Sequence, residues 1–279
     1  MTQQSSPTCK TQPPMKVSAI IPTYNDGNDL KEAILSVSRS TYPILEIIVV
    51  DDGSSSQEAQ SIVEALNPQL DIHLLFKKKE NGGPASARNE GIRMAQGDWI
   101  IFLDSDDLML PESINSKFAH YKKCTKKENI VAIYGSFLLS PTMFKRSFNE
   151  CYESVNRNYI GRKVPGGAPA YIFNKEALVK IGGFDESLIF NEDFDLLLRL
   201  IKSGDSLVGN NAPGFIRNIK ETSLTRSSSF KALRGSRKFL KKAFYEDLLS
   251  TPEILLRLSI NLLLSLKEVF LFLASKFFR

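Results

Sequence analysis

Hydrophobic and polar positions alternate in blocks along the first hundred residues, as they do in mixed α/β proteins. Four short apolar runs predict buried strands at residues 16–22, 45–50, 72–76 and 98–103. The segments between them have helical character and predict helices at residues 28–40, at residues 56–66, and after a glycine turn within residues 81–95. Such alternation indicates an α/β fold with an open, largely parallel sheet and helices on both faces.

Three of these apolar runs end in polar or acidic residues, with the sequences PTYND, DDGSS and DSDD. In open α/β sheets, ligands bind outside the carboxyl ends of the strands. Asp104, Asp106 and Asp107 would repel one another unless a cation lies between them. An acidic turn that caps the next helix is the alternative, but chance turns of this kind would be spread over both edges of the sheet. The pattern therefore favours a cation and ligand site at the carboxyl edge.

The second half of the chain is less regular. Residues 137–168 lack periodicity and contain the sequence VPGGAP, which predicts a mobile loop over one side of the site. Residues 191–204 have helical spacing and end at Gly204. Glu192 and Asp193 lie at the start of this helix, where its dipole favours ionised carboxylates.

The charge distribution argues against a nucleic-acid partner. The chain has a net charge of +5, but residues 231–279 carry ten Lys or Arg and four Asp or Glu, while the first 230 residues carry 26 basic and 27 acidic groups. Only the tail is basic, so only the tail would attract anions. The three widely spaced cysteines argue against a disulfide framework or a zinc site and fit a reducing compartment.

Five motifs together resemble family 2 glycosyltransferases, which are inverting enzymes of the GT-A fold that use nucleotide-activated sugars. The motifs occur in the family's order and near its spacing: VSAIIPTYND, IIVVDDGSS, NGGPASARNEGIRMAQGDWIIFLDSDD, GGFDE and NEDFDLLLR. The resemblance covers roughly residues 16–205. It implies a Rossmann-like GT-A sheet and a nucleoside-diphosphate sugar as donor.

The resemblance also assigns the donor side of the site. It implies that Asp52 contacts the nucleotide base and that Thr23 lies against the same base, although Thr23 is as easily a turn residue at a strand end. It implies that Asn81 and Gly83 form the loop that lets the backbone approach the ligand. Arg88, one turn into the next helix, would contact the nucleotide part of the donor; a surface arginine is the alternative. The neighbouring Asp51 is expected to be structural.

Asp104 and Asp106 resemble the family's DxD pair. The resemblance implies that Asp106 binds Mn²⁺ or Mg²⁺ and that Asp104 reaches the ribose or the water shell of the metal. Asp107 either orients this pair or caps the following helix.

Asp193 resembles the family's catalytic base, which takes the proton of the acceptor hydroxyl. Glu192 is the rival, and Asp195 is expected to serve the first turn of its own helix. The sequence lacks the QxxRW motif that processive synthases of the family carry, so it favours the addition of a single sugar.

The tail combines basic side chains with many Leu, Ile and Phe residues. Its longest uncharged run, residues 258–266, is far shorter than the ~20 residues that span a bilayer. An amphipathic helical appendage at a membrane surface fits this composition. Packing of these helices on the catalytic domain, or a dimer seam, is the alternative.

The sequence thus predicts three parts: a disordered leader (1–15), a GT-A domain (16–230) and a helical tail (231–279). The predicted activity is transfer of one sugar to a hydroxyl acceptor, with a lipid-linked glycan as one candidate acceptor, in assembly of a cell-envelope glycan such as lipopolysaccharide, capsule or glycolipid. The expected location is cytoplasmic, at the inner face of the membrane. A silent nucleotide-sugar binding protein and a metal-dependent nucleotidyltransferase are the alternative functions, and a homodimer is left open.

Overall fold

The computed structural model of the chain describes residues 14–124, 127, 129–140, 144–146, 167–218, 229–250 and 252–255. The predicted leader, apart from residues 14 and 15, lies outside these residues. So do most of the segment 137–168 and the end of the tail. The fold below is that of the described part of the chain.

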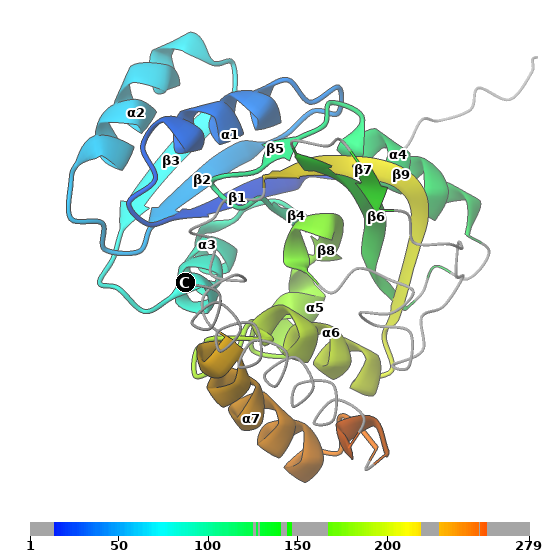
Figure 1. Ribbon diagram of the computed structural model, residues 1–279. Coiled ribbons are helices and arrows are strands. Elements are labelled where there is room, and N and C mark those ends of the chain that lie inside the picture. The colour runs from blue at the N-terminus through cyan, green and yellow to red at the C-terminus, as the bar shows by residue number, and fades with distance from the viewer. Residues whose placement is uncertain are drawn as a thin grey trace, which may run out of the picture.

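A single curved sheet runs through the described residues (Figure 1). Its strands follow the order β3-β2-β1-β4-β8-β6-β9-β5, and β7 pairs with β6 off this path. Their bounds are β1 Val17–Thr23, β2 Glu46–Asp51, β3 His73–Lys78, β4 Trp99–Phe102, β5 Leu108–Met109, β6 Ile130–Ser140, β7 Phe144–Arg146, β8 Tyr171–Asn174 and β9 Ser206–Asn218. The first four strands are parallel, and β8 joins β4 in the antiparallel direction.

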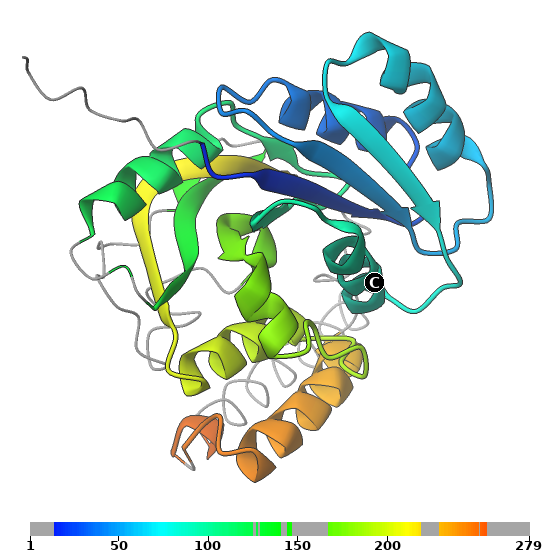
Figure 2. The same ribbon diagram turned by 180° about the vertical axis from the view of Figure 1, so that it is seen from behind.

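Helices cover both faces of the parallel part of the sheet. Their bounds are α1 Asn28–Ser38, α2 Glu58–Leu66, α3 Pro84–Met94, α4 Ser113–Lys123, α5 Lys175–Lys180, α6 Glu192–Lys202 and α7 Ser229–Tyr245. Figures 1 and 2 show α1 and α2 on one side of β1–β3 and α3 on the other. Every residue of β1 and β2 is buried, as expected for strands covered on both faces. The predicted α/β sheet is therefore confirmed.

The parallel register brings the ends of distant segments together. Thr23 at the end of β1 lies opposite Asp51 at the end of β2, and β4 lies on the other side of β1. The backbone N–H of Asp52 donates to the Thr23 carbonyl over 2.9 Å. The loops that follow β1, β2 and β4 therefore leave the sheet at one edge, as the strand pattern predicts.

The second half differs from the prediction in one respect. Residues 137–140 were expected to lie in an irregular loop, but they complete β6, because Leu139 and Ser140 pair with Arg217 and Asn218 of β9. Hydrogen bonding to a distant strand thus extends a segment that lacks a local pattern. A short 3₁₀ helix, Ala168–Ala170, then leads into β8.

The described part of the tail packs against α6. Phe239, Leu240 and Ala243 of α7 are buried, and the Phe239 ring meets Phe194 of α6 edge-on at 5.7 Å. Figures 1 and 2 both show α7 lying against α6. Among the described helices, none has the length and apolar character needed to cross a membrane.

Candidate active site

The loop after β2 holds two acids with different surroundings. Asp51 is 1% exposed, and its Oδ1 accepts hydrogen bonds from the backbone N–H of Ser54 at 2.9 Å and from the Ser54 hydroxyl at 2.5 Å. Lys78 lies 3.8 Å from its other oxygen. Asp51 therefore fastens the turn 51–54, in agreement with the structural role expected of it.

Asp52 faces the first turn of α3. Its carboxylate accepts hydrogen bonds from the backbone N–H groups of Gly82 at 3.0 Å and Gly83 at 2.7 Å, and from Lys79 Nζ at 2.8 Å. Asn81 Nδ2 donates to the backbone carbonyl of Asp52 over 2.9 Å. Gly83 has a φ of 86°, which only glycine adopts without strain. A carboxylate has about four acceptor positions, so Asp52 retains capacity for one further N–H.

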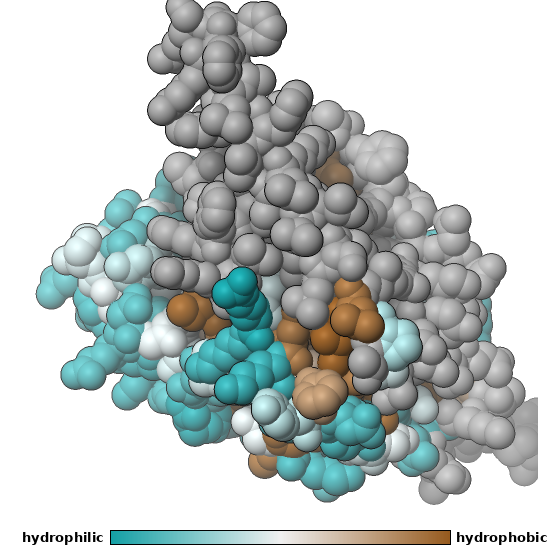
Figure 3. All heavy atoms as spheres, turned by 60° about the horizontal axis from the view of Figure 1, so that its bottom comes forward, coloured by the Kyte–Doolittle hydropathy of each residue, from teal (hydrophilic) through white to brown (hydrophobic). Residues whose placement is uncertain are grey.

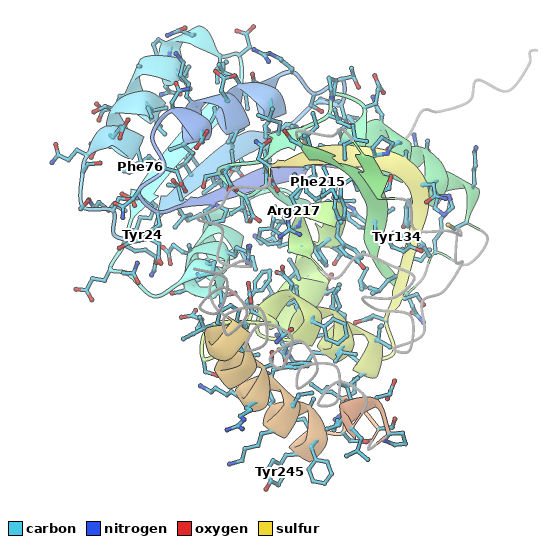
Figure 4. All side chains as sticks on the ribbon, in the orientation of Figure 1. Tyr24, Phe76, Tyr134, Phe215, Arg217 and Tyr245 are labelled. Atoms are coloured by element: carbon cyan, nitrogen blue, oxygen red, sulfur yellow. The ribbon has the colours of Figure 1, made fainter. Side chains whose placement is uncertain are left out.

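Thr23 lies beside this loop with an unsatisfied hydroxyl. Its residue is 3% exposed, and within the described residues its Oγ1 has no hydrogen-bond partner. Leaving a buried hydroxyl unpaired costs about 1–3 kcal/mol, which a polar ligand atom at this position would recover. The next residue, Tyr24, is 52% exposed and offers an aromatic face directly after the end of β1 (Figure 4). Sequence reasoning passed over Tyr24, although it stands within the PTYND motif.

Arg88 is the centre of the acid cluster. It is 4% exposed, and its two terminal nitrogens contact Asp104 at 2.9 Å, Glu192 at 3.2 Å and Asp193 at 3.4 Å. Its guanidinium also lies 5.4 Å from the centre of the Phe184 ring. Burial disfavours the charge, but the nearby acids outweigh it and raise the pKa of Arg88. The alternative of a surface arginine is therefore wrong.

The two candidate bases share the same guanidinium. Burial and repulsion from Asp193 raise the pKa of Glu192 to about 7. Burial also raises the pKa of Asp193, against the opposing charge of Arg88 and the backbone N–H of Ala168. Asn191, which precedes Glu192, has a φ of 64° in the left-handed region. This is a strained backbone of the kind found at functional sites. Contacts alone thus leave Asp193 and Glu192 both within the cluster.

The acidic loop after β4 is held by the end of β9. Asn218 donates from its backbone N–H to Asp107 Oδ1 over 2.9 Å and from Nδ2 to the carbonyl of Asp106 over 2.5 Å. Burial, followed by repulsion from Asp104, raises the pKa of Asp107 to about 8. The alternative of a helix cap is wrong, because α4 begins at Ser113 and no side chain caps it. Asp107 instead ties the acidic loop to β9.

The acidic loop suits a divalent cation whose remaining ligands come from the substrate. The Asp104 side chain is 38% exposed and the Asp106 residue is partly exposed, so both reach solvent. No group of three or more Asp, Glu, His or Cys among the described residues could hold a metal alone. Mg²⁺ and similar ions are usually held by one or two carboxylates together with substrate phosphates. Burial is the main cause of the raised pKa of Asp107, and repulsion from Asp104 and Asp106 adds to it, so a cation beside this loop would offset part of that repulsion.

Arg217 and Asn218 are site residues that sequence reasoning missed. The positive charge of Arg217 lowers the pKa of both Asp107 and Asp193, so it lies near both acids (Figure 4). Both lie in β9, which was not predicted because the second half of the chain has no regular pattern. No local signal marks them, because the strand sequence VGNNAPGFIRN mixes polar and apolar residues.

The structure thus brings the predicted residues into two adjoining clusters. Thr23, Asp52, Asn81 and Gly83 form the first, and Arg88, Asp104 and Asp193 form the second. The first turn of α3 joins them, since Gly83 precedes that helix and Arg88 lies within it. Asp106 lies at the rim of the second cluster, in the loop that Asn218 holds.

A family model described as glycosyl transferase family 2 matches residues 18–182. An uncharacterized glycosyltransferase of Haemophilus influenzae is 29% identical over 198 residues, which cover 67% of this chain and 62% of the relative. Another, from Rickettsia bellii, is 38% identical over 194 residues, which cover 67% of this chain and 27% of the relative. The chain therefore spans less than two thirds of the length of the curated relatives it matches.

Solved structures share the fold. Staphylococcus aureus TarS 1–349 in complex with UDP-GlcNAc superimposes with a TM-score of 0.69 at 21% identity, over 89% of this chain and 72% of TarS 1–349. The mannosyltransferase PcManGT of Pyrobaculum calidifontis, in complex with GDP-Man and Mn²⁺, superimposes with a TM-score of 0.62 at 20% identity, over 83% of this chain and 65% of PcManGT. At these identities the likeness establishes the GT-A fold.

Proposed function

Because the chain belongs to glycosyl transferase family 2, we propose that it transfers one sugar from a nucleoside-diphosphate sugar to a hydroxyl acceptor, with inversion. One observation carries the proposal: Arg88 joins Asp104, from the acidic loop, to Asp193, 89 residues further along the chain. A donor site and a base must lie side by side for transfer in a single step. The TarS and PcManGT structures are complexes with UDP-GlcNAc and GDP-Man, which supports a donor of this class.

The first cluster is the proposed nucleotide site. Asp52 would accept an N–H from the base with its remaining acceptor position, and the unpaired Thr23 hydroxyl would bond a polar atom of the same base. The exposed Tyr24 ring would stack on the base, since every nucleobase has a face suited to stacking. Gly82 and Gly83, which carry no side chains, would let the nucleotide approach the backbone beside them.

Asp106 and Asp104 are the proposed holders of Mn²⁺ or Mg²⁺. These two carboxylates would hold the ion, which would supply positive charge to offset the negative charge that develops on the leaving diphosphate. Asn218 fixes the backbone of Asp106, so the acidic loop is held in place before a donor arrives. Arg88 and Arg217 add positive charge on the protein side of the diphosphate.

Asp193 is the proposed base, with Glu192 as its rival. The acceptor oxygen attacks the anomeric carbon while its proton passes to the Asp193 carboxylate, and the bond from that carbon to the diphosphate breaks. The bonding electron pair leaves with the nucleoside diphosphate, so attack from the opposite face inverts the anomeric configuration. A base of this kind contributes roughly 10²–10⁴ in rate.

The proposed setting is assembly of a cell-envelope glycan at the cytoplasmic face of the membrane, with a lipid-linked acceptor. The outward face of α7 supports a membrane contact, since Phe244 is 56% exposed and Tyr245 is 74% exposed, with the exposed Arg237 two turns earlier. Tyr245 lies at the end of α7 that points away from the sheet (Figure 4). Figure 3 views the molecule from the bottom of Figure 1 and shows apolar side chains beside hydrophilic ones on that face.

A donor panel tests the proposed function. Purified protein with Mn²⁺ is mixed with UDP-sugars and GDP-sugars, thermal shift selects the donors that bind, and turnover of those donors is followed by release of nucleoside diphosphate. Nuclear magnetic resonance of the product reports its anomeric configuration. Release of nucleoside diphosphate with an inverted product supports the proposal. Donor binding without any turnover would identify a silent binding protein, and release of nucleoside monophosphate with a joined product would identify a nucleotidyltransferase.

Flotation with liposomes tests the membrane contact separately. Removing α7 would expose the apolar surface under Phe239, so point variants are the cleaner design. The full chain should float with vesicles of equal parts phosphatidylcholine and phosphatidylglycerol, and the F244S/Y245S double variant should float less. Leu45→Ser changes an exposed leucine just before β2 and is the matched control. Equal flotation of all three proteins would refute a membrane contact through α7.

A further inference from the structure

One face of α7 contacts the start of α6 on both sides of the proposed base. Asn191 Nδ2 donates to Ser236 Oγ over 3.2 Å, just before the base. Phe239 packs edge-on against Phe194, the residue that follows Asp193. Ser236 and Phe239 are three positions apart on α7, so they lie on the same face of that helix.

Lys242 lies on the same face of α7 one turn further along and forms ion pairs with two acids. Its Nζ lies 2.9 Å from Oδ1 of Asp195 and 2.7 Å from Oδ2 of Asp185. Asp195 is 0% exposed, so its charge is entirely removed from water and depends on partners within the protein. Its second partner is Arg199, whose Nε lies 2.7 Å from Oδ2. The sequence-based expectation that Asp195 serves only its own helix turn is therefore incomplete.

This ion-pair network leads back to the acid cluster. Arg199 donates to the carbonyls of Ile181 at 2.8 Å and Gly183 at 2.7 Å, which fixes the loop before Phe184. The backbone of Phe184 exchanges two hydrogen bonds with the Asn89 side chain, at 2.8 and 2.9 Å. Asn89 is the neighbour of Arg88 on α3. Contacts therefore run from Lys242 through α6 to the helix that carries Arg88.

We propose that Lys242 is a positioning residue for the reaction, and that α7 acts through it to hold Asp193 in the geometry that takes the acceptor proton. The inference rests on the proposed function. Helix α7 lies beyond residues 18–182, which the family model matches, so this part of the chain adds to the matched core. A base displaced by about 1 Å can lose roughly a hundredfold in rate, so a remote clamp has a measurable effect on turnover.

The contacts of Lys242 are on the base side of the site, which predicts a selective loss. Neither Asp185 nor Asp195 touches the nucleotide cluster around Asp52, so donor affinity should not depend on this lysine. Lys242→Met removes the charge while keeping most of the side-chain volume. Lys242→Arg restores a cation that can reach both acids. Lys241→Met removes a charge from the exposed neighbouring position and is the matched control.

The experiment measures donor turnover and its KM with Mn²⁺, well below the unfolding temperature of each variant. Hydrogen exchange of residues 191–198 and 84–94 is measured in parallel. Lys242→Met should lower kcat about tenfold to a hundredfold with KM changed less than twofold, and should speed exchange in 191–198, which Lys242 contacts directly, more than in 84–94, which lies several contacts away. Lys242→Arg should recover most of the kcat, and Lys241→Met should match the wild type.

Each outcome decides the inference. An unchanged kcat in Lys242→Met, or a loss of kcat shared by Lys241→Met, overturns it. Equal acceleration of exchange in both segments would show a general loss of stability and would also overturn it. If the wild-type chain turns over no donor, the proposed function fails, while selective exchange in 191–198 still shows that α7 holds the start of α6.

Discussion

The proposed donor side and the proposed base side of the site are held together in different ways. On the donor side, Asp52 is bound by backbone N–H groups only 30 and 31 positions away, within consecutive strand and helix units. On the base side, Asp193 meets Arg88 across 105 positions, and Asp195 meets Lys242 across 47. The donor side is thus built mainly from local backbone geometry, and the base side from charged side chains that converge from distant helices.

This difference indicates which parts of the site tolerate change. Backbone N–H groups stay in place when side chains are substituted, so the donor loop should keep its shape in many variants. A cluster of buried charges depends on every member, because removing one partner leaves another charge unpaired at a cost of several kcal/mol. Substitutions on the base side should therefore affect turnover, and those on the donor side should affect affinity.

The largest effect is expected at Asp193. Asp193→Asn keeps the shape of the side chain but cannot take a proton, so kcat should fall roughly a thousandfold while donor affinity stays within about threefold. Donor turnover and calorimetry measure the two quantities. Asp98→Asn, an exposed acid at the start of β4, is the control and should behave as the wild type. If Glu192→Gln shows the larger loss of kcat, Glu192 is the base instead.

The pH profile of the wild type sharpens the same point. A base must be deprotonated to act, and burial raises the pKa of Asp193 above its ordinary value. Turnover should therefore decline on the acid side at a higher pH than an ordinary aspartate would give. A profile that stays flat down to the ordinary aspartate range would contradict a buried carboxylate as the base.

A smaller effect, in affinity, is expected at Asp52. Asp52→Asn places an amide N–H₂ among N–H donors and removes an acceptor, so donor affinity should fall about tenfold to a hundredfold. The kcat at saturating donor should change little, because the base side is intact. Calorimetry with the donor chosen by the panel measures the affinity. A thousandfold loss of kcat in this variant would contradict the claim that the donor side sets affinity and the base side sets turnover.

The smallest of these effects concerns a buried charge away from both clusters. Lys117 of α4 is 0% exposed, and its Nζ bonds Ser113 Oγ at 3.0 Å and the Ser113 carbonyl at 3.4 Å. No acidic partner is seen for it in the described part of the chain, and burial lowers its pKa to about 7. Lys117→Met should therefore raise the free energy of unfolding by about 1–2 kcal/mol at neutral pH. Lys122→Met, at an exposed position of the same helix, should change it by less than about 0.5 kcal/mol.

The sign of the pH dependence follows from this pKa. The pKa of Lys117 is about 7 in the folded chain and its ordinary value is 10.5, so between these values the unfolded chain binds more protons. Wild-type stability should rise with pH across this window, and Lys117→Met should lose that contribution. Chemical denaturation at pH 7 and pH 9 measures it. An equal pH slope in both proteins would show that Lys117 is hydrated or paired.

The sequence predicts the local side of this comparison well. The apolar runs predicted at residues 16–22, 45–50 and 98–103 correspond to strands that end at Thr23, Asp51 and Phe102, and the glycine turn before Pro84 marks the start of α3. Those features are set by neighbouring residues, so a pattern records them. The resemblance adds Asp104, Asp106 and Asp193, whose roles stay predictions.

The sequence does not show the long-range side. Nothing near Asp195 indicates that it needs Lys242, because the pairing depends on how α7 packs against α6. The role of Asn218 is not visible in the sequence for the same reason. It bonds Asp107 only because the pairing of β9 with β5 places it beside the acidic loop. Distant contacts of this kind appear only once the chain is folded.

The central claim is that the acidic loop holds a divalent ion needed for diphosphate binding, and that Asp193 acts only in the chemical step. Calorimetry of nucleoside diphosphate binding tests this claim most directly. UDP and GDP are titrated into the wild type, Asp106→Ala and Asp193→Asn, each with and without Mn²⁺. The account predicts that Mn²⁺ strengthens binding of one nucleotide to the wild type and to Asp193→Asn, and that Asp106→Ala loses most of this gain. An equal gain in all three proteins, or an equal loss in both variants, would contradict it.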